Sequence, residues 1–383
     1  MTSISSAIAS SESFTIQPIS GDDDLQQFLD VPQAVYGDDP NWVPPIRSDI
    51  AKQVGPEGAF RAYGTLQGFI AKQGDRLLGR IVASVNRRLV EREGQSVGLF
   101  GYFECVDDEA VATALFDAAA EWLRSQGMTT IRGPIDLSTH NNCQMLIDGF
   151  EEPPMVMMPY NLPHYPTLWE SYGFTKAKDA YAYRFEPHDM AEQFEKAYRI
   201  AIKSGVTFRS IATKGEDFEK DVRSLYRLFT ETFANNWSST PRTEDEFFEE
   251  AKSLQILVDP DLFPIAEIDG EMVGFFMALP DYNEVLKRVN GKLDWIGILK
   301  FLWFRRTIER VRVLAFASLP EHRRKLIPLA MVHLAFQGGT KKNKRYTWAE
   351  LGWVYEDNMS SRKIVEKASG KIYKTYRIYE KEL

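Results

Sequence analysis

One order of elements is predicted twice along this chain of 383 residues. In each half, a hairpin is followed by a long strand, a helix, a strand, a second helix and a final strand. The apolar residues that mark the strands are clearest at 76–86 and 96–106 in the first half and at 272–279 and 310–319 in the second. Because strands and helices alternate, we predict an α/β fold, with an α+β mixed sheet covered by helices and two similar domains in tandem.

The length of the chain also favours two domains, because a single hydrophobic core rarely serves so many residues. We place the N-terminal domain at residues 1–190 and the C-terminal domain at residues 206–383, with a linking helix over 191–205. Within the N-terminal domain a helix is predicted over 109–126, and Asp108 is suited to cap its first turn.

The charge distribution limits the partners of the protein. The net charge of -8 argues against general nucleic-acid binding, so no nucleic-acid partner is expected. Residues 284–345 nevertheless hold 15 Lys and Arg residues against four Asp and Glu residues, which favours an anionic partner there. Cys105 and Cys143 have neither metal-ligand nor redox spacing, so we expect no metal. Since we recognise no secretory signal and no membrane-spanning stretch, we expect a cytoplasmic protein.

The sequence "SLPEHRRKLIPLAM" at 318–331 has the pattern of a strand end, a basic loop and a helix start. Free backbone N–H groups and the dipole at a helix start favour an anion such as phosphate. Loops of this kind are usually rich in glycine, whereas this one has Leu326 and Pro328. Pro328 is expected at the first helical position, where its missing N–H has no helical partner. From the residues alone, phosphate binding and an ordinary solvated turn both remain open.

This loop resembles the CoA-binding loop of the GNAT superfamily of acyl-CoA N-acyltransferases, whose pattern is Arg/Gln-x-x-Gly-x-Gly/Ala. Arg323 occupies its first place, Leu326 and Pro328 occupy the two places of small residues, and Asn358 begins a second motif of the superfamily. Longer stretches, among them "VYGDDPNWVPPIRSD", "IRGPIDLS" and "ELGWVYEDN", are similar to a bacterial family of tandem GNAT proteins that includes bacterial ceramide synthases.

The resemblance implies an acyl-CoA-dependent N-acyltransferase, which moves an acyl group from a CoA thioester to an amine. The acceptor implied by the ceramide synthases is a long-chain (sphingoid) base. The alternatives are an acetyltransferase for a small amine and a non-catalytic GNAT-like protein that binds a lipid or a partner. A transferase that uses aminoacyl-tRNA is a further alternative, which the acidic N-terminal domain disfavours.

The resemblance implies a CoA site in the C-terminal domain. The residues that it implies for CoA binding are Phe316, Ala317, Ser318, Arg323, Arg324, Lys325, Leu326, Ile327 and Asn358. In the N-terminal domain, Asp107, Asp108 and Glu109 stand at the corresponding helix start and would repel a pyrophosphate. The N-terminal domain is therefore expected to bind no CoA and to supply structure or acceptor contacts.

Attack of an amine on a thioester needs a base for the ammonium proton and donors for the oxyanion. Backbone N–H groups of residues 316–318 are candidate donors. Glu350 is the first candidate base, and Glu104, on the matching strand of the N-terminal domain, is the second. His140 lies in a polar loop, titrates in a useful range and is a candidate for the acceptor pocket or an ordinary turn residue.

Many members of the superfamily use a tyrosine of the last helix to protonate the leaving thiolate. Val365 occupies that place here, so Tyr355, Tyr373 or Tyr376 is the candidate substitute. A thiolate leaves readily, and the acid could also be dispensable.

The segment "LDWIGILKFLWFRR" at 293–306 combines large apolar residues with three cations. It is too short to cross a bilayer. It suits peripheral contact with an anionic membrane, such as the inner membrane face, the wall of an acyl tunnel, or an ordinary core element. The Pro-rich stretches at 35–49 and 153–165 are expected to form walls between the domains, where ligands often lie.

Overall fold

A computed structural model describes residues 13–37, 39–186, 191–233, 236–289, 294–341, 344 and 346–383. The helices and strands of the first half are β1 (Thr15–Pro18), α1 (Asp22–Tyr36), α2 (Arg47–Val54), β2 (Gly64–Gln73), β3 (Arg76–Asn86), α3 (Arg87–Glu93), β4 (Val97–Cys105), α4 (Glu109–Ser125), β5 (Thr130–Gly133), β6 (Met145–Asp148), α5 (Tyr165–Ser171) and β7 (Thr175–Phe185).

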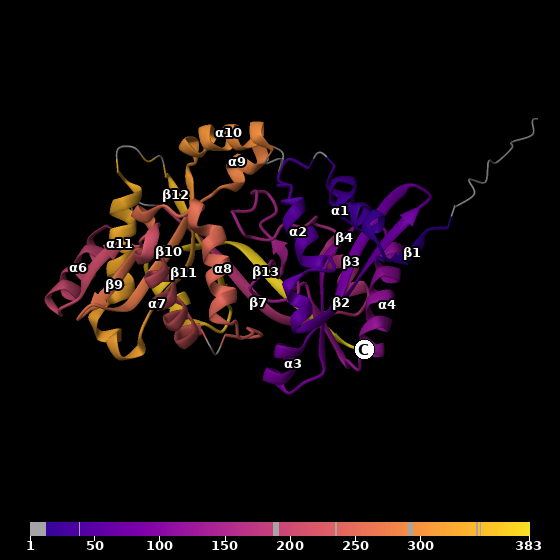
Figure 1. The fold of residues 1–383 in the computed structure, drawn as a ribbon, viewed down its shortest axis with the longest axis horizontal. Helices are drawn as coiled ribbons and strands as arrows, with labels where there is room; N and C mark the ends of the chain where they lie inside the picture. The colour runs from indigo at the N-terminus through magenta and orange to yellow at the C-terminus, as the bar shows by residue number, and fades with distance from the viewer. Residues whose placement is uncertain are drawn as a thin grey trace, which may run out of the picture.

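The helices and strands of the second half are α6 (Ala191–Lys203), β8 (Thr207–Ser210), α7 (Gly215–Phe233), α8 (Glu244–Leu254), β9 (Pro264–Ile268), β10 (Glu271–Pro280), α9 (Asn283–Arg288), α10 (Trp295–Phe304), β11 (Arg310–Ser318), α11 (Ile327–Gly339), β12 (Trp348–Tyr355), α12 (Met359–Lys367) and β13 (Lys371–Glu382). The two halves lie side by side, with the first half at the right of Figure 1. The predicted mixed α/β fold is confirmed, and each predicted strand and helix named above is present within a few residues.

Alternation along the central strands explains why helices cover both faces of the sheet. In β3, Ile81 and Ala83 join the core cluster under α4, whereas Val82, between them, joins the cluster under α1. Neighbouring side chains of a strand point to opposite faces, so a strand that is apolar throughout is buried on both sides. The predicted cap of α4 is also confirmed, because the Asp108 carboxylate accepts from the N–H of Ala110 at 2.9 Å.

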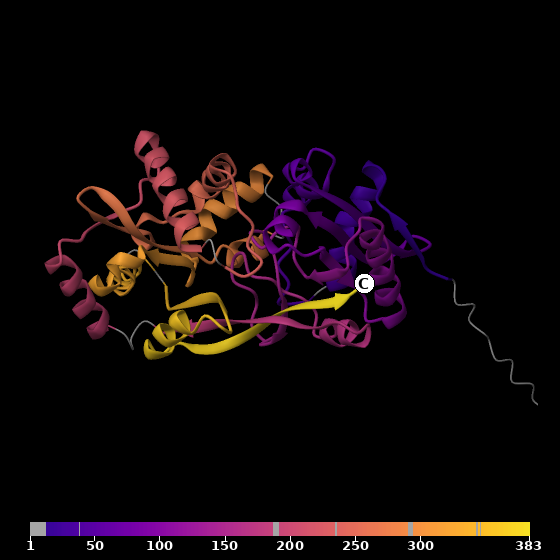
Figure 2. The ribbon, with the colours of Figure 1, turned by 90° about the horizontal axis from the view of Figure 1, so that it is seen from below.

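The two halves share one sheet because they exchange their last strands. The strand order is β1-β2-β3-β4-β5-β13-β7-β12-β11-β10-β9-β8, with β6 also paired to β13. The C-terminal strand β13 therefore lies between β5 and β7 of the first half, and β7 lies between β13 and β12. Figure 2 shows β13, in yellow, running from the second half into the first beside β7. The proposed domain boundary in the chain remains a prediction, but the sheet crosses it.

Each half also contains a parallel strand pair that separates early. The pairing of β4 with β5 extends to Leu99 and Arg132, although β4 continues to Cys105. The pairing of β11 with β12 extends to Val313 and Leu351, although β11 continues to Ser318. Beyond these residues the two strands of each pair are no longer paired with one another, although the N–H of Ile135, just after β5, still donates to the carbonyl oxygen of Phe100. We call this point of separation the opening of each half.

The segment at 293–306 forms the exposed helix α10 at the top of Figure 1, so the expectation of a core element is wrong. Leu293 lies outside the described residues. Pro328 is the second residue of α11, not the first, because Ile327 already has helical geometry. Across the described part of the chain, no helix combines the length and apolarity needed to span a membrane.

Candidate functional site

A cavity of about 900 Å³ lies between the two halves. Its walls include β4, the loops at 134–145 and 154–161, and the segment 42–46, as expected for the two Pro-rich stretches. From the second half, α7, α8, β10, β11 and β12 contribute residues. The predicted site residues that line this cavity are Glu104, His140, Phe316 and Asn358.

Glu104 lies in this cavity within a ring of polar groups. The Tyr165 hydroxyl donates to its carboxylate at 2.9 Å, and the Arg80 guanidinium lies 3.5 Å away. Burial raises the pKa of Glu104, although Arg80 and the hydroxyls of Tyr36 and Tyr165 lower it. The Glu104 side chain is 14% exposed, so it can reach a group bound in the cavity. A carboxylate with a raised pKa can accept a proton from an amine near neutral pH.

Asp136 is a second buried carboxylate on the same wall. It accepts from the backbone N–H of Tyr102 at 2.6 Å, in the opening between β4 and β5. Burial raises its pKa to about 7. The N–H of Cys105, further along β4, donates to the Tyr165 hydroxyl at 2.9 Å. Two backbone N–H groups at the opening of the N-terminal half, those of Tyr102 and Cys105, are thus already hydrogen-bonded to side chains of the protein.

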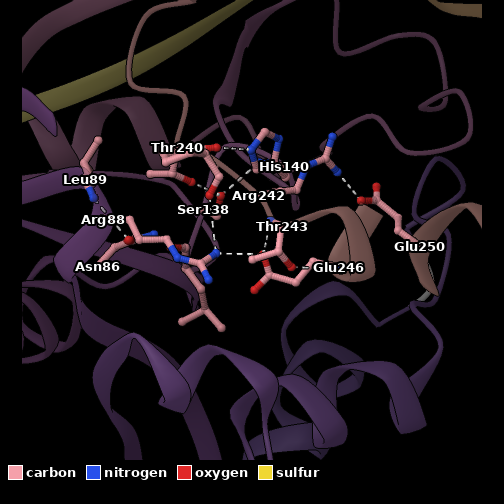
Figure 3. A network of polar contacts seen from close by, with 12 residues as sticks. Asn86, Arg88, Leu89, Ser138, His140, Thr240, Arg242, Thr243, Glu246 and Glu250 are labelled. Carbon is pink, nitrogen blue, oxygen red and sulfur yellow. Dashed lines mark hydrogen bonds and ion pairs between the residues drawn. The ribbon is translucent and has the colours of Figure 1, made fainter. Parts of the chain in front are cut away.

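His140 joins the two halves. Its Nε2 lies 2.7 Å from the carbonyl oxygen of Thr240, which can only accept, so Nε2 carries the proton and Nδ1 is the free acceptor. Burial lowers the pKa of His140 to about 4, so the ring is neutral at pH 7. Figure 3 shows it within a polar network that includes the ion pair of Arg88 with Glu246 at 2.8 Å. This hydrogen bond fixes the segment around Thr240, in the second half, to the His140 loop of the first half.

Glu350 lies behind the cavity wall. It is fully buried in β12, where the Tyr373 hydroxyl donates to Oε2 and Arg312 Nε lies 3.5 Å from Oε1. Burial raises its pKa. Arg312 itself lines the cavity and donates to the carbonyls of Val156 and Gly352. Glu350 therefore faces the cavity only through Arg312.

The expectation that Glu104 and Glu350 lie on matching strands is wrong. By the order of elements, β4 corresponds to β11, and β12 corresponds to β5. Tyr376 is fully buried, and within the described ranges its hydroxyl has no hydrogen-bond partner. Of the three candidate tyrosines, Tyr355 lines the large cavity, while Tyr373 contacts Glu350.

The predicted CoA loop is a 3₁₀ turn, Pro320–Lys325, that leads into α11. Arg323 and Arg324 are exposed, as a contact with phosphate requires. Lys325 is engaged elsewhere, because its Nζ donates to the carbonyl oxygen of Ser204 at 2.6 Å. Leu326 adopts φ 55° and ψ 30°, the left-handed conformation that glycine adopts most easily.

Ile327 can offer only its backbone N–H to a ligand, because its side chain is fully buried. Ala317 and Ser318 lie at the half-buried end of β11. The Asn358 side chain caps α12 by accepting from the N–H of Ser361 at 3.1 Å. The start of α11, by contrast, carries no side-chain cap among the described residues, and since Pro328 has no N–H, the N–H groups of Ile327 and Leu329 are the ones it can offer to a ligand.

A second, apolar cavity of about 140 Å³ lies between α11, α12 and the strands β11 and β12. Phe316 and Leu351 line both cavities. These residues flank the point at which β11 and β12 separate. The opening of the C-terminal half thus stands between a large cavity on one side and a small apolar one on the other.

Sequence reasoning missed Arg80, Asp136 and Tyr165. A signal was present, because Arg80 and Glu104 each stand within an apolar run of a predicted strand. Two opposite charges inside neighbouring strands are expected to pair, and Arg80 is directly opposite Glu104 in the β3–β4 register. Within the described part of the molecule, no group of three or more His, Cys, Asp or Glu residues could hold a metal ion.

Comparison with solved structures supports the architecture. A tandem GNAT protein from the clavulanic acid biosynthesis pathway superposes with a TM-score of 0.57 at 12% identity, covering 97% of this chain and 98% of that one. A GCN5-related N-acetyltransferase from Sphaerobacter thermophilus superposes with a TM-score of 0.52 at 14% identity, covering 96% and 95% of the two chains. At these identities the likeness establishes the fold.

Comparison of sequences identifies the family, although no protein-family model matches. The chain is 31% identical over 365 residues to Protein YghO of Escherichia coli, covering 94% of this chain and 93% of that protein. It is 32% identical over 388 residues to the bacterial ceramide synthase of Caulobacter vibrioides, covering 96% of this chain and 97% of that protein. With the fold just described, this similarity along nearly the whole length shows that the chain belongs to the tandem-domain GNAT superfamily of N-acyltransferases, in the family of the Caulobacter ceramide synthase.

Proposed function

We propose that the protein transfers a long-chain acyl group from acyl-CoA to the amine of a long-chain base. The observation that carries this proposal is the two-sided lining of the large cavity between the halves. One part of the lining, on α7, α8 and β10, is mostly apolar, and another part, on β3 and β4, holds Arg80 and Glu104. Each half also contributes residues of the other kind, so the division is between these two patches and not between the halves. A substrate that is part aliphatic chain and part polar amine has this same division.

The apolar side suits an aliphatic chain. It is lined by aromatic and aliphatic residues of α7, α8 and β10, among them Phe218, Leu225, Phe229, Phe247, Leu254 and Phe275. Burying each CH₂ of a chain against such a wall contributes about 0.8 kcal/mol. An acetyl group would leave most of this wall in contact with water, so the lining favours a long acyl chain or a long-chain acceptor.

The polar side suits the amine of the acceptor. In this proposal Glu104 accepts the ammonium proton, and Arg80 and Tyr165 hold its carboxylate in place. The free amine then attacks the thioester carbonyl, the C–N bond forms, and the C–S bond breaks to release the CoA thiolate. Glu350 acts as a positioning residue, since it reaches the cavity only through Arg312.

The oxyanion of the tetrahedral intermediate would be stabilised at the C-terminal opening. β11 pairs with β10 as far as Ser318 but with β12 only as far as Val313, so the backbone N–H groups of 314–318 that point away from β10 are the candidate donors. Preorganised N–H groups of this kind contribute about 3 kcal/mol each to such a transition state. We propose that Arg323, Arg324 and the uncapped start of α11 hold the CoA phosphates, with the small apolar cavity beside the pantetheine arm.

Calorimetry with acetyl-CoA and palmitoyl-CoA, both below the micellar concentration, tests this proposal first. We expect tight binding of palmitoyl-CoA and weak binding of acetyl-CoA, followed by transfer to sphinganine in an activity assay. Equal binding of the two would instead favour acetylation of a small amine. Binding of neither would favour the non-catalytic, lipid-binding alternative, for which Leu326 in place of glycine is the supporting observation.

A further inference from the structure

Helix α10 is apolar on every side, although it lies on the surface. Its inner side is formed by Gly297, Phe301 and Phe304, and the Phe301 ring stacks on Tyr282 with 5.4 Å between centroids. A surface helix normally carries polar residues opposite its buried face. The sequence "WIGILKFLWF" offers only Lys300 as a charged residue over the whole helix.

The outer side of α10 presents an apolar stripe to solvent. Trp295, Leu299, Leu302 and Trp303 are 73%, 60%, 43% and 71% exposed. Their spacing of i, i+4, i+7 and i+8 places them along one face of the helix. A stripe of this size with two tryptophans is characteristic of a contact surface, since single exposed apolar residues are common but contiguous ones are not.

Cations surround this stripe. Lys300 lies within the helix, and Arg305 and Arg306 follow it directly; all three are exposed. The nearest acidic residue, Asp294, uses its carboxylate to cap the helix at the N–H of Gly297, 2.7 Å away. The chain as a whole carries a net charge of -8, so this positive surface is local.

We infer that α10 docks the protein on the surface of an anionic bilayer. The tryptophans at its two ends would lie at the level of the headgroups, with Leu299 and Leu302 below them and the cations against anionic lipids. A second copy of the chain is a poorer occupant. In a two-fold contact the same patch faces itself, so Lys300, Arg305 and Arg306 of one copy would meet those of the other.

The docking surface is one helix away from the large cavity. Tyr282, on which Phe301 stacks, directly precedes α9, and Asn283 and Leu286 of α9 line the cavity. A long-chain amine held in the bilayer would thus pass beside α9 into the cavity. This last step rests on the proposed function, whereas docking itself does not.

Co-sedimentation of the full chain with vesicles tests the inference. The vesicles are pure phosphatidylcholine or phosphatidylcholine mixed with phosphatidylglycerol. The variants are Trp295→Ser with Trp303→Ser, and Lys300→Gln with Arg305→Gln and Arg306→Gln. The matched control replaces two exposed isoleucines of other elements, Ile202→Ser with Ile372→Ser.

We expect the wild-type protein and the control to bind the anionic vesicles. The triple variant should bind them roughly a hundredfold more weakly, because each basic residue near such a surface contributes about 1 kcal/mol. The tryptophan variant should bind both kinds of vesicle at least tenfold more weakly than the wild type. Wild-type protein that stays unbound, or variants that bind like the control, would overturn the inference. Equally, a dimer that the tryptophan substitutions convert to a monomer would assign the stripe to self-association.

Activity separates this inference from the proposed function. With a water-soluble short-chain amine, the tryptophan variant should work as fast as the wild type. With a long-chain amine embedded in anionic vesicles, it should be at least tenfold slower. A wild-type protein that binds vesicles but acylates neither amine would contradict the proposed function and leave docking intact.

Discussion

In both halves of the molecule a parallel strand pair separates early, yet the exposed backbone N–H groups meet different neighbours. In the N-terminal half, Asp136 accepts from Tyr102 and the Tyr165 hydroxyl accepts from Cys105. In the C-terminal half, β11 pairs with β10 as far as Ser318 but with β12 only as far as Val313, so within the residues described only the N–H groups of 314–318 that point away from β10 lack a strand partner. We therefore propose that the opening of the C-terminal half is the one that binds a ligand.

The helix starts beside the two openings differ in the same sense. Asp108 caps α4 and adds negative charge with its neighbours, whereas α11 begins without a side-chain cap next to Arg323 and Arg324. One half is thus closed to anions, and the other is open to them. This difference supports the proposal that the second half holds the CoA ester and the first half presents Glu104 to the acceptor.

The largest effect is expected for Glu104→Gln. A glutamine cannot accept the ammonium proton, so the turnover number should fall by about a thousandfold while affinity for acyl-CoA is unchanged. Burial raises the pKa of Glu104, so this carboxylate becomes protonated at a higher pH than an ordinary carboxyl group. As the pH falls, the wild type should therefore lose turnover before the usual pH range of carboxyl groups is reached. Steady-state rates over pH and calorimetry measure both. A larger loss in Glu350→Gln would move the base to the C-terminal half.

The next largest effect is expected for Arg323→Glu combined with Arg324→Glu. Reversal of two phosphate contacts should weaken CoA binding at least a hundredfold without unfolding the protein. The control, Arg87→Glu with Arg124→Glu, makes the same change in net charge on exposed residues of the N-terminal half. CoA binding measured by calorimetry should be unaffected in the control. Equal losses in the two variants would show an effect of net charge rather than a site.

A third effect concerns the contact that joins the halves. Burial lowers the pKa of His140 from its usual value of 6.5 to about 4, so the unfolded chain binds the proton more tightly than the folded one. Folding stability from this group is complete above pH 6.5 and is lost as the pH falls toward 4, by roughly 2 kcal/mol at pH 5. His140→Gln removes the titration, so the wild type should lose that much more stability between pH 7.5 and 5. Denaturant unfolding at both pH values measures the difference, and identical losses would contradict it.

The smallest effect is expected for Leu326→Gly. The left-handed conformation of Leu326 lowers the stability of the fold by about 1 to 2 kcal/mol relative to glycine. Part of this gain is offset in the glycine variant, because glycine loses more backbone entropy on folding. The variant should bind CoA a few-fold more tightly, because the backbone can approach the phosphates. Asp269→Gly, at φ 52° in the β9–β10 turn, is the control with the same backbone change away from the loop. A gain in both variants would reflect backbone strain alone.

Sequence patterns were sufficient for the elements and for the local features that depend on neighbouring residues. The cap at Asp108 follows from a short-range rule, and the exposed position of Arg323 agrees with the family resemblance. The surroundings of side chains that depend on strands distant in the sequence could not be predicted in this way. The sequence made Glu350 a candidate base. In the fold its strand β12 is central, between β11 and β7, and the Glu350 side chain is fully buried.

Contacts over long distances in the chain explain the remaining differences. Lys325 has a partner 121 residues earlier, and His140 has one 100 residues later. No periodicity or spacing encodes such pairs. Helix α10 is a different case: its composition left a membrane contact, a tunnel wall and a core element open, and in the fold it packs on one side only.

The exchange of β7 and β13 has a consequence for folding during synthesis on the ribosome. The first half leaves the ribosome early, yet the place between β5 and β7 is filled by β13, which is synthesised about 190 residues after β7. Until then, two strand edges of the first half remain open, and such edges invite wrong pairing. The sheet of the first half is therefore completed only when β13 has been added, and the two halves are expected to unfold together.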